Sequence, residues 1–194
     1  MNAFVTVWVR WSQALERYAR GPIILFFTVM SALFGLVVLP RGGAQLKSTS
    51  GGVGPIDTLF FYTPDRVYDM IAAYGEAGRA MYRTSALTAD LIYPIAYSLF
   101  LGLAITWCFG RLPAGWRWGQ RLNVLPFGAA LFDVLENVSV AIMLSVHPAR
   151  PALLAWMATA FTMTKWGLVG VSVGTLAIGC IFLGTNEVWR KLKF

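Results

Sequence analysis

The sequence contains one histidine and two cysteines, and these shortages argue against several kinds of catalytic and metal site. A bis-histidine haem, a histidine-rich metal site and a Ser–His–Asp triad all need a buried histidine, whereas His147 lies beside Pro148 in a predicted turn. Cys108 and Cys180 have no CxxC spacing. We therefore expect two small buried side chains rather than a dithiol redox enzyme. Carboxylates could hold Mg²⁺, but Lys165 would compete for them, so we expect no metal and no cofactor.

Charge is scarce as well, because only 13% of the 194 residues are charged and 57% are hydrophobic. Four apolar runs are long enough to cross a bilayer, which takes about 20 residues for ~30 Å of hydrocarbon. Because the runs lack the two-residue alternation of barrel strands, they predict helices. No glycine-rich phosphate loop follows a strand. The runs cover residues 22–39, 87–109, 124–146 and 152–184. The sequence thus predicts an all-α membrane protein, a four-transmembrane-helix bundle that forms one membrane domain over residues 1–194.

The net charge of +7 is distributed in a way that indicates membrane orientation rather than nucleic-acid binding. Basic residues gather before the first run, between the second and third runs, and at the C-terminus, whereas the third connection has only Arg150. These are Arg10, Arg17, Arg20, Arg111, Arg117, Arg121, Arg190, Lys191 and Lys193. This asymmetry predicts a bacterial inner (cytoplasmic) membrane protein with both termini in the cytoplasm and basic groups near anionic lipid. We expect no cleavable signal peptide, since about 20 residues including Glu16 precede the first run.

Two further helices are expected outside the four spans. An apolar stripe over residues 1–20 predicts an amphipathic helix at the membrane interface, and its members are Phe4, Trp8, Trp11, Leu15 and Tyr18. Pro40 is expected to end the first span and open a periplasmic loop over residues 40–86. The Gly- and Ser-rich part, residues 41–54, predicts no regular structure. Thr63 as a cap and Pro64 at the first position predict an amphipathic helix over residues 64–83, acting as a linker or a lid at the periplasmic mouth.

Lys165 is the most informative residue, because a charge near the bilayer centre costs about 2.5–3.5 kcal/mol and needs a partner. The turn between residues 146 and 152 makes the last two spans an antiparallel hairpin with a common rise of ~1.5 Å per residue. Counting back from that turn places Lys165 level with residue 134, between Asp133 and Glu136. Thr162 falls opposite Asn137. We therefore expect a buried cluster in which two acids face one base.

The second span adds polar groups to the same region. Asp90, Tyr93 and Tyr97 lie on one helical face, and Pro94 can kink the helix beside Asp90. The candidate catalytic residues are Asp133, Glu136 and Lys165. The candidate ligand-binding residues are Arg79, Asp90, Tyr93, Tyr97, Asp133, Glu136, Asn137, Thr162 and Lys165.

Several stretches of the sequence have a distinctive wording: Tyr62-Thr-Pro, Tyr74-Gly-Glu-Ala-Gly-Arg79 with Tyr82, Asp90-Leu-Ile-Tyr-Pro94-Ile-Ala-Tyr97, Phe132-Asp133-Val-Leu-Glu136-Asn137 and Thr162–Trp166. Together they resemble an uncharacterised family of bacterial four-span integral membrane proteins. The resemblance covers roughly residues 55–170. It implies a four-span fold and no particular activity.

Three functions stay open at the level of sequence. The first is binding of a lipid or other lipophilic small molecule, with Arg79 and Asp90 near the periplasmic leaflet. The second is an intramembrane lipid-modifying enzyme with Asp133 or Glu136 as general acid or base. The third is a structural or accessory subunit whose polar cluster only fastens helices. The expected partners are membrane lipids and such a small molecule, with a membrane-protein partner or a second copy as further possibilities and no nucleic acid.

Overall fold

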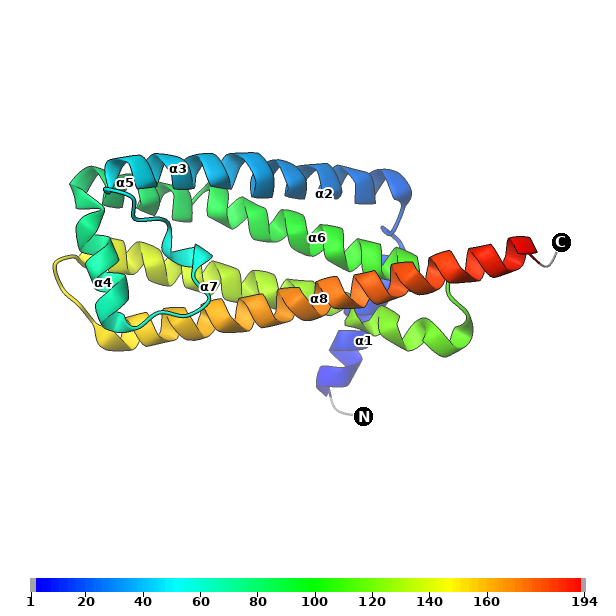
Figure 1. Cartoon of the computed structure of the whole chain (residues 1–194). Coiled ribbons are helices and arrows are strands. Elements are labelled where there is room, and N and C mark those ends of the chain that lie inside the picture. The colour runs from blue at the N-terminus through cyan, green and yellow to red at the C-terminus, as the bar shows by residue number, and fades with distance from the viewer. Residues whose placement is uncertain (1–2, 193–194) are drawn as a thin grey trace.

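The computed structural model describes residues 3–192, with side chains described for residues 8–116 and 118–185. The fold is all-α, as predicted (Figure 1). The elements in chain order are α1 (Ala3–Glu16), α2 (Gly21–Leu33), η1 (Phe34–Val38), α3 (Leu39–Thr49), η2 (Ile56–Thr58), α4 (Pro64–Ala73), α5 (Gly75–Ala86), α6 (Ala89–Phe109), η3 (Ala114–Val124), α7 (Leu125–Val146) and α8 (Ala152–Leu192).

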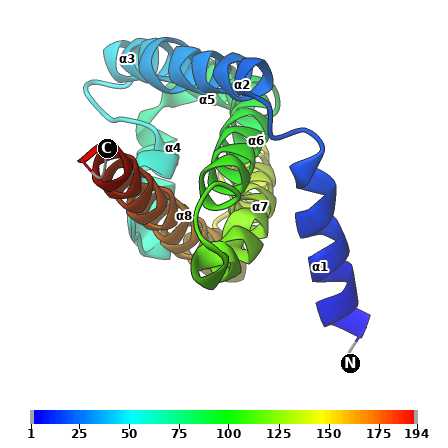
Figure 2. The same ribbon diagram turned by 90° about the vertical axis from the view of Figure 1, so that its right-hand side faces the viewer.

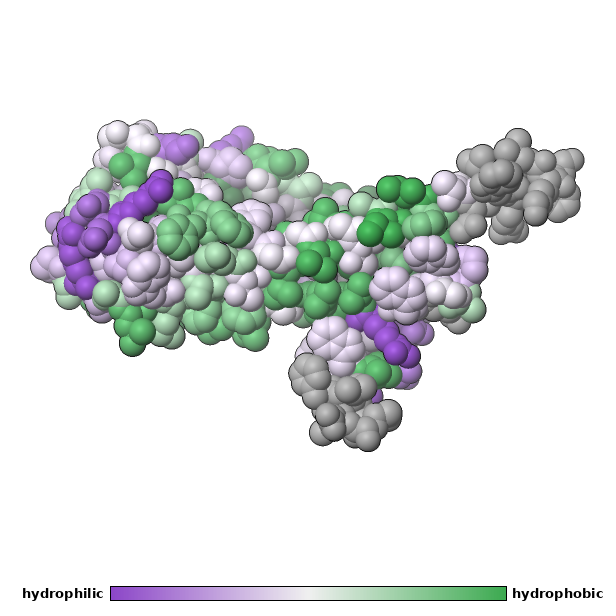
Figure 3. All heavy atoms as spheres, turned by 60° about the horizontal axis from the view of Figure 1, so that its bottom comes forward, coloured by the Kyte–Doolittle hydropathy of each residue, from purple (hydrophilic) through white to green (hydrophobic). Residues whose placement is uncertain are grey.

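Four long helical stretches are apolar enough to cross a membrane, which makes the chain a multi-span membrane protein. They are Gly21–Thr49, Gly75–Phe109, Ala114–Val146 and Ala152–Thr185. Apolar side chains cover the flank of the bundle, and hydrophilic ones gather at the end where α4 lies (Figure 3). Leu25 is 63% exposed and Leu36 is 76% exposed on the first of these stretches. Such exposure is favourable when the surrounding medium is lipid rather than water.

The four long stretches form a bundle in which α6, α7 and α8 make the centre. The α7–α8 hairpin packs along its length, α6 packs on both of its members, and α2 lies on the outer side of α6 (Figure 2). Ala129, Ala155 and Ala158 are fully buried. Small side chains of this kind let membrane helices approach closely. The final turns of α8 extend past the other helices at the end where η3 lies (Figure 1).

The opposite end of the bundle is closed by α4, which crosses between α5 and the start of α8 (Figure 1). Its inner face buries Val67, Tyr68 and Ile71. The Tyr68 hydroxyl donates a 2.9 Å hydrogen bond to the carbonyl of Pro151, which ties α4 to the hairpin turn. The segment before α4 turns inward, so that Tyr62 is fully buried beneath it.

The structure corrects the expectation that residues 41–54 lack regular structure, because residues 41–49 belong to α3. The five-residue π-helical turn η1 precedes Pro40. A wider turn relieves the clash between a proline ring and the carbonyl four residues earlier, so the helix continues. Leu46 then anchors α3, as it is only 2% exposed and packs in the core below α4. The Ser50 hydroxyl ends the helix by donating to the carbonyls of Leu46 and Val53.

The helix expected over residues 64–83 is two helices, α4 and α5. Thr63 caps α4 as predicted, since its hydroxyl accepts a 3.4 Å hydrogen bond from the Arg66 amide. The interruption falls at Gly75, which has φ of +65°. Only glycine adopts this left-handed conformation without a steric penalty. The turn redirects the chain, so that α5 runs directly towards α6 instead of lying wholly across the bundle.

At the other end of the molecule, α1 packs on η3, and the N-terminal part of α1 extends away from the bundle (Figure 2). The Trp8 indole donates to the carbonyl of Arg121 at 2.9 Å. Asn123 donates to the carbonyl of Ser12 and to the Thr106 hydroxyl, which joins α1 to α6. The side chains of Phe4 and Arg117, and of Arg190, Lys191 and Lys193, lie outside the described residues.

The two cysteines lie together, which the spacing in the sequence did not reveal. Cys108 Sγ on α6 and Cys180 Sγ on α8 are 4.0 Å apart, and both thiols are free. A Cβ added at Gly179 would lie 3.0 Å from Cys108 Sγ, so this glycine permits the close approach of the two helices. Cys108 is buried, whereas Cys180 is exposed. The expectation of two buried side chains is therefore wrong for Cys180.

Mild oxidation with copper phenanthroline is expected to join Cys108 and Cys180, because an approach of about 2 Å brings the sulfurs to the bonding distance. Peptide mass spectrometry after alkylation should find the two cysteine peptides linked in monomeric protein. The variant Cys108→Ser is the control and should show no such link. Thiols that both stay open to alkylation after oxidation would contradict the packing of α6 on α8.

Candidate functional site

The polar cluster lies in the middle of the α7–α8 hairpin, where the depth count places it. Lys165 Nζ is 2.6 Å from Glu136 Oε2 and 3.4 Å from Asp133 Oδ1. Glu136 is fully buried, and Asp133 and Lys165 are 7% and 6% exposed. The sequence-based prediction of an Asp133–Glu136–Lys165 cluster is therefore confirmed. One ammonium group is shared between two carboxylates.

Glu136 belongs to the closed side of the cluster. The depth count places Thr162 opposite Asn137, and its hydroxyl donates a 2.7 Å hydrogen bond to Oε1 of the adjacent Glu136. Behind Thr162 stands Tyr62, whose hydroxyl is 3.4 Å from the Thr162 hydroxyl. Burial raises the pKa of Tyr62 to about 12, so this phenol stays neutral. Each polar group on this side has a partner inside the protein, as expected of a structural contact.

Asp133 belongs to the open side of the cluster. The Tyr97 hydroxyl donates to Asp133 Oδ2 at 3.2 Å, and Asn137 Nδ2 donates to Asp133 Oδ1 at 3.3 Å. Asn137 also donates to the backbone carbonyl of Asp90 at 2.8 Å, which fixes α7 against the start of α6. The Tyr93 and Tyr97 rings meet edge to face with centroids 5.2 Å apart. These contacts orient the Asp133 carboxylate towards neighbouring space rather than filling it.

That space is a cavity of about 930 Å³ between α2–α3 on one side and α6 and α8 on the other. Figure 2 shows these helices from the end of the bundle, with α2 and α3 apart from α8. The polar lining includes Asp90, Asp133 and Lys165. Much of the remaining wall is apolar and includes Val38, Leu39, Phe100, Leu101, Val169 and Val173. The hollow therefore has a mainly apolar wall and a charged region on α6, α7 and α8.

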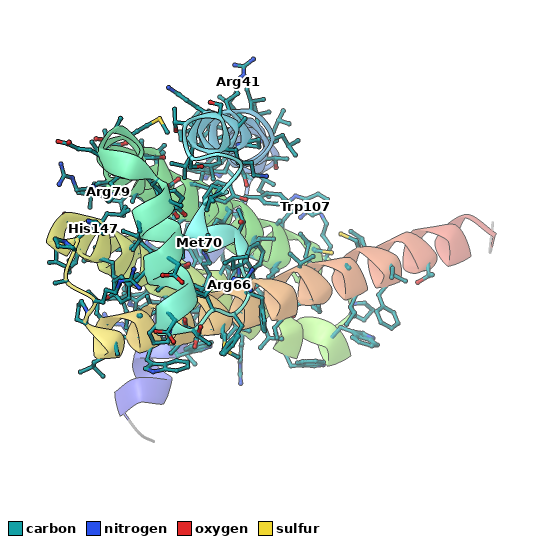
Figure 4. All side chains as sticks on the ribbon, turned by 60° about the vertical axis from the view of Figure 1, so that its left-hand side comes forward. Arg41, Arg66, Met70, Arg79, Trp107 and His147 are labelled. Carbon is teal, nitrogen blue, oxygen red and sulfur yellow. The ribbon has the colours of Figure 1, made fainter. Side chains whose placement is uncertain are left out.

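The candidate residues divide into three groups by their place relative to the cavity. Those that line it are Asp90, Tyr93, Tyr97, Asp133 and Lys165. Glu136, Asn137 and Thr162 lie behind this lining and hold it through hydrogen bonds or the ion pair. Arg79 is elsewhere: its guanidinium donates to the carbonyl of Ile71, and it lies with His147 at the α4 end of the molecule (Figure 4).

Two charged residues that the sequence did not single out also line the cavity, namely Lys47 on α3 and Asp57 on η2. Asp57 Oδ1 accepts a 3.0 Å hydrogen bond from the Tyr82 hydroxyl. The same hydroxyl accepts a 3.0 Å bond from the Ile56 amide, so Tyr82 fixes η2 over the cavity. Lys47 occurs in the segment expected to be irregular, and Asp57 lies just after it. Only the tertiary fold brings the two residues to the cavity. In the sequence, the only indication of a role for Asp57 is that a charged residue stands between Pro55-Ile56 and Thr58.

Comparisons of the chain with family models, curated proteins and solved structures found no match, so the resemblance noted from the sequence identifies no family. The four-span architecture implied by that resemblance is present.

Proposed function

We propose that this protein binds a lipid or another lipophilic small molecule in the cavity between α2–α3 and α8. The observation that carries the proposal is the combination of a large apolar hollow with the Asp133–Lys165 pair in its wall. A volume of about 930 Å³ lies in the range of small-molecule sites, which are mostly apolar with a few converging polar groups. A purely structural ion pair needs no such hollow.

The chemistry of the wall orients an amphiphile. Its apolar part lies along Phe100, Leu101 and Val173, where burial is favourable in proportion to the apolar area covered. Its polar part meets Asp133 and Lys165, whose own partners already hold them in place. Since α2–α3 and α8 face one another across the cavity, the space between them offers a route from the surrounding lipid.

We further propose the inner membrane of a bacterium as the location, with both termini on the cytoplasmic side. The supporting observation is that α1, η3 and the end of α8 share one end of the molecule (Figure 1). Most of the basic residues noted above belong to these parts of the chain, in keeping with the positive-inside rule.

A lipid-modifying enzyme is the second candidate, and the observation that favours it is the exposure of Asp133 to the cavity. There Asp133 could exchange a proton with a bound substrate while Lys165 stabilises the carboxylate. Glu136 is unsuited to this role, because it is fully buried and does not line the cavity among the described residues. An enzyme returns an altered molecule, whereas a binding protein returns the same one.

The proposal is tested by filling the cavity. Val169→Phe is expected to lower the amount of copurifying amphiphile several-fold, because Val169 lines the cavity and a ring there occupies the ligand's volume. Val171→Phe is the matched control, as Val171 lies on the same helix and is 54% exposed. Quantitative mass spectrometry of detergent-purified protein measures the content. An equal lipid content in the two variants and the wild type would contradict the proposal.

A further inference from the structure

The charges around the cavity are unbalanced, and the imbalance indicates what kind of head group it accepts. Three carboxyl groups line it, those of Asp57, Asp90 and Asp133. Glu136 lies directly behind and shares Lys165 with Asp133. The lining cations are Lys165 and the exposed Lys47. Four carboxyl groups thus stand against two ammonium groups, one of which is at the solvent-exposed rim.

Asp90 is the most telling of these acids. It is only 7% exposed, and it lines the cavity. Among the described residues, ion pairs join only Arg150 to Asp69 and Lys165 to the two acids of the cluster. Asp90 therefore has no ion-pair partner among the residues whose side chains are described. A buried charge is costly without a counter-charge.

Asp57 is a second carboxylate in the lining without an ion-pair partner among the described residues. The Tyr82 hydroxyl is its hydrogen-bond donor. Lys165, the one buried cation in the lining, is already engaged by Glu136 at 2.6 Å. An anionic head group would meet more repulsion than attraction from these neighbours, whereas a cationic one would be stabilised by the unpaired acids.

We infer that the cavity selects an amphiphile with a protonated amine, which the carboxylates of Asp90, Asp133 and Asp57 receive. This rests on the proposed function and adds the chemical class of the head group. The ammonium group supplies both the missing positive charge and N–H donors for carboxylate oxygens. The apolar tail lies along the wall formed by η1, the start of α3, α6 and α8.

The test compares three probes of the same chain length: a long-chain primary amine, the alcohol and the carboxylic acid. Each is titrated against the full-length protein in a neutral maltoside detergent, and binding is followed by native mass spectrometry. We expect the amine to bind wild type about tenfold more tightly than the alcohol, and the acid to bind most weakly. Asp90→Asn should remove most of the preference for the amine, because it keeps the shape of the side chain and deletes its charge.

Asp69→Asn is the matched control, since Asp69 lies on α4 in an exposed pair with Arg150 and should retain the wild-type preference. If Asp90→Asn does not fold, Asp57→Asn takes its place in the test. Asp57→Asn should weaken binding of the amine and leave binding of the alcohol unchanged. Equal binding of amine and alcohol by wild type, or an undiminished preference in both cavity variants, would overturn the inference and leave the proposed function standing. Failure of all three probes to bind would overturn both.

Discussion

Replacing Lys165 with methionine is expected to lower the free energy of unfolding by about 3–5 kcal/mol, because removing one partner leaves a buried ionic cluster uncompensated. Glu136 is fully buried and 2.6 Å from the ammonium group, so it bears most of this cost. Thermal denaturation in detergent should show a midpoint lower by of order 10 °C. Methionine preserves most of the side-chain volume, so a cavity effect contributes little.

The double variant Glu136→Gln with Lys165→Met should recover more than half of that loss. It leaves Asp133 as the one acid of the cluster, and the hydrogen bonds from Tyr97 and Asn137 still stabilise it. Arg150→Met is the control for loss of a basic residue. Its partner Asp69 has a side chain 69% exposed, so we expect a cost below about 1 kcal/mol. A double variant no more stable than Lys165→Met alone would show that the Glu136–Lys165 contact is not what stabilises the cluster.

The central part of the site could be predicted from the sequence because the last two spans form a hairpin with a short turn. In such a hairpin the depth of each residue follows from the rise per residue. The count therefore placed Lys165 between Asp133 and Glu136 correctly. It did not reveal that Thr162 bonds to Glu136, since counting gives the depth of a side chain but not its direction around the helix axis.

The cavity could not be predicted in the same way, because its far wall comes from a distant part of the chain. α3 was expected to be irregular from its glycines and serines, yet tertiary contacts of Leu46 make it helical. Asp57 reaches the cavity only because the Tyr82 hydroxyl holds η2 in place. Neither contact leaves a periodic pattern in the sequence.

The closeness of Cys108 and Cys180 illustrates the same limit. A spacing of 72 residues carries no signal for a pair of thiols, and the contact depends on how α6 and α8 pack. Arg79 is a related case. The sequence places it near the periplasmic leaflet beside Asp90, whereas its guanidinium donates to the carbonyl of Ile71 and it does not line the cavity.

The two carboxylates of the cluster are expected to differ in what they do. Glu136→Gln should lower stability by about 3 kcal/mol or more, because an amide group would replace a buried carboxylate oxygen beside the ammonium group. Asp133→Asn should cost about 1 kcal/mol or less, since it leaves one acid paired with one base. Asp133 lines the cavity and Glu136 lies behind it, so ligand binding should depend on Asp133.

The measurement that tests this division most directly is the amount of amphiphile per mole of purified Asp133→Asn, determined by mass spectrometry beside the wild type. The expected result is a protein with nearly wild-type thermal stability and an amphiphile content reduced about tenfold. An Asp133→Asn protein that is equally stable and carries the wild-type amount of the same molecule would contradict the assignment of the Asp133–Lys165 pair to ligand binding.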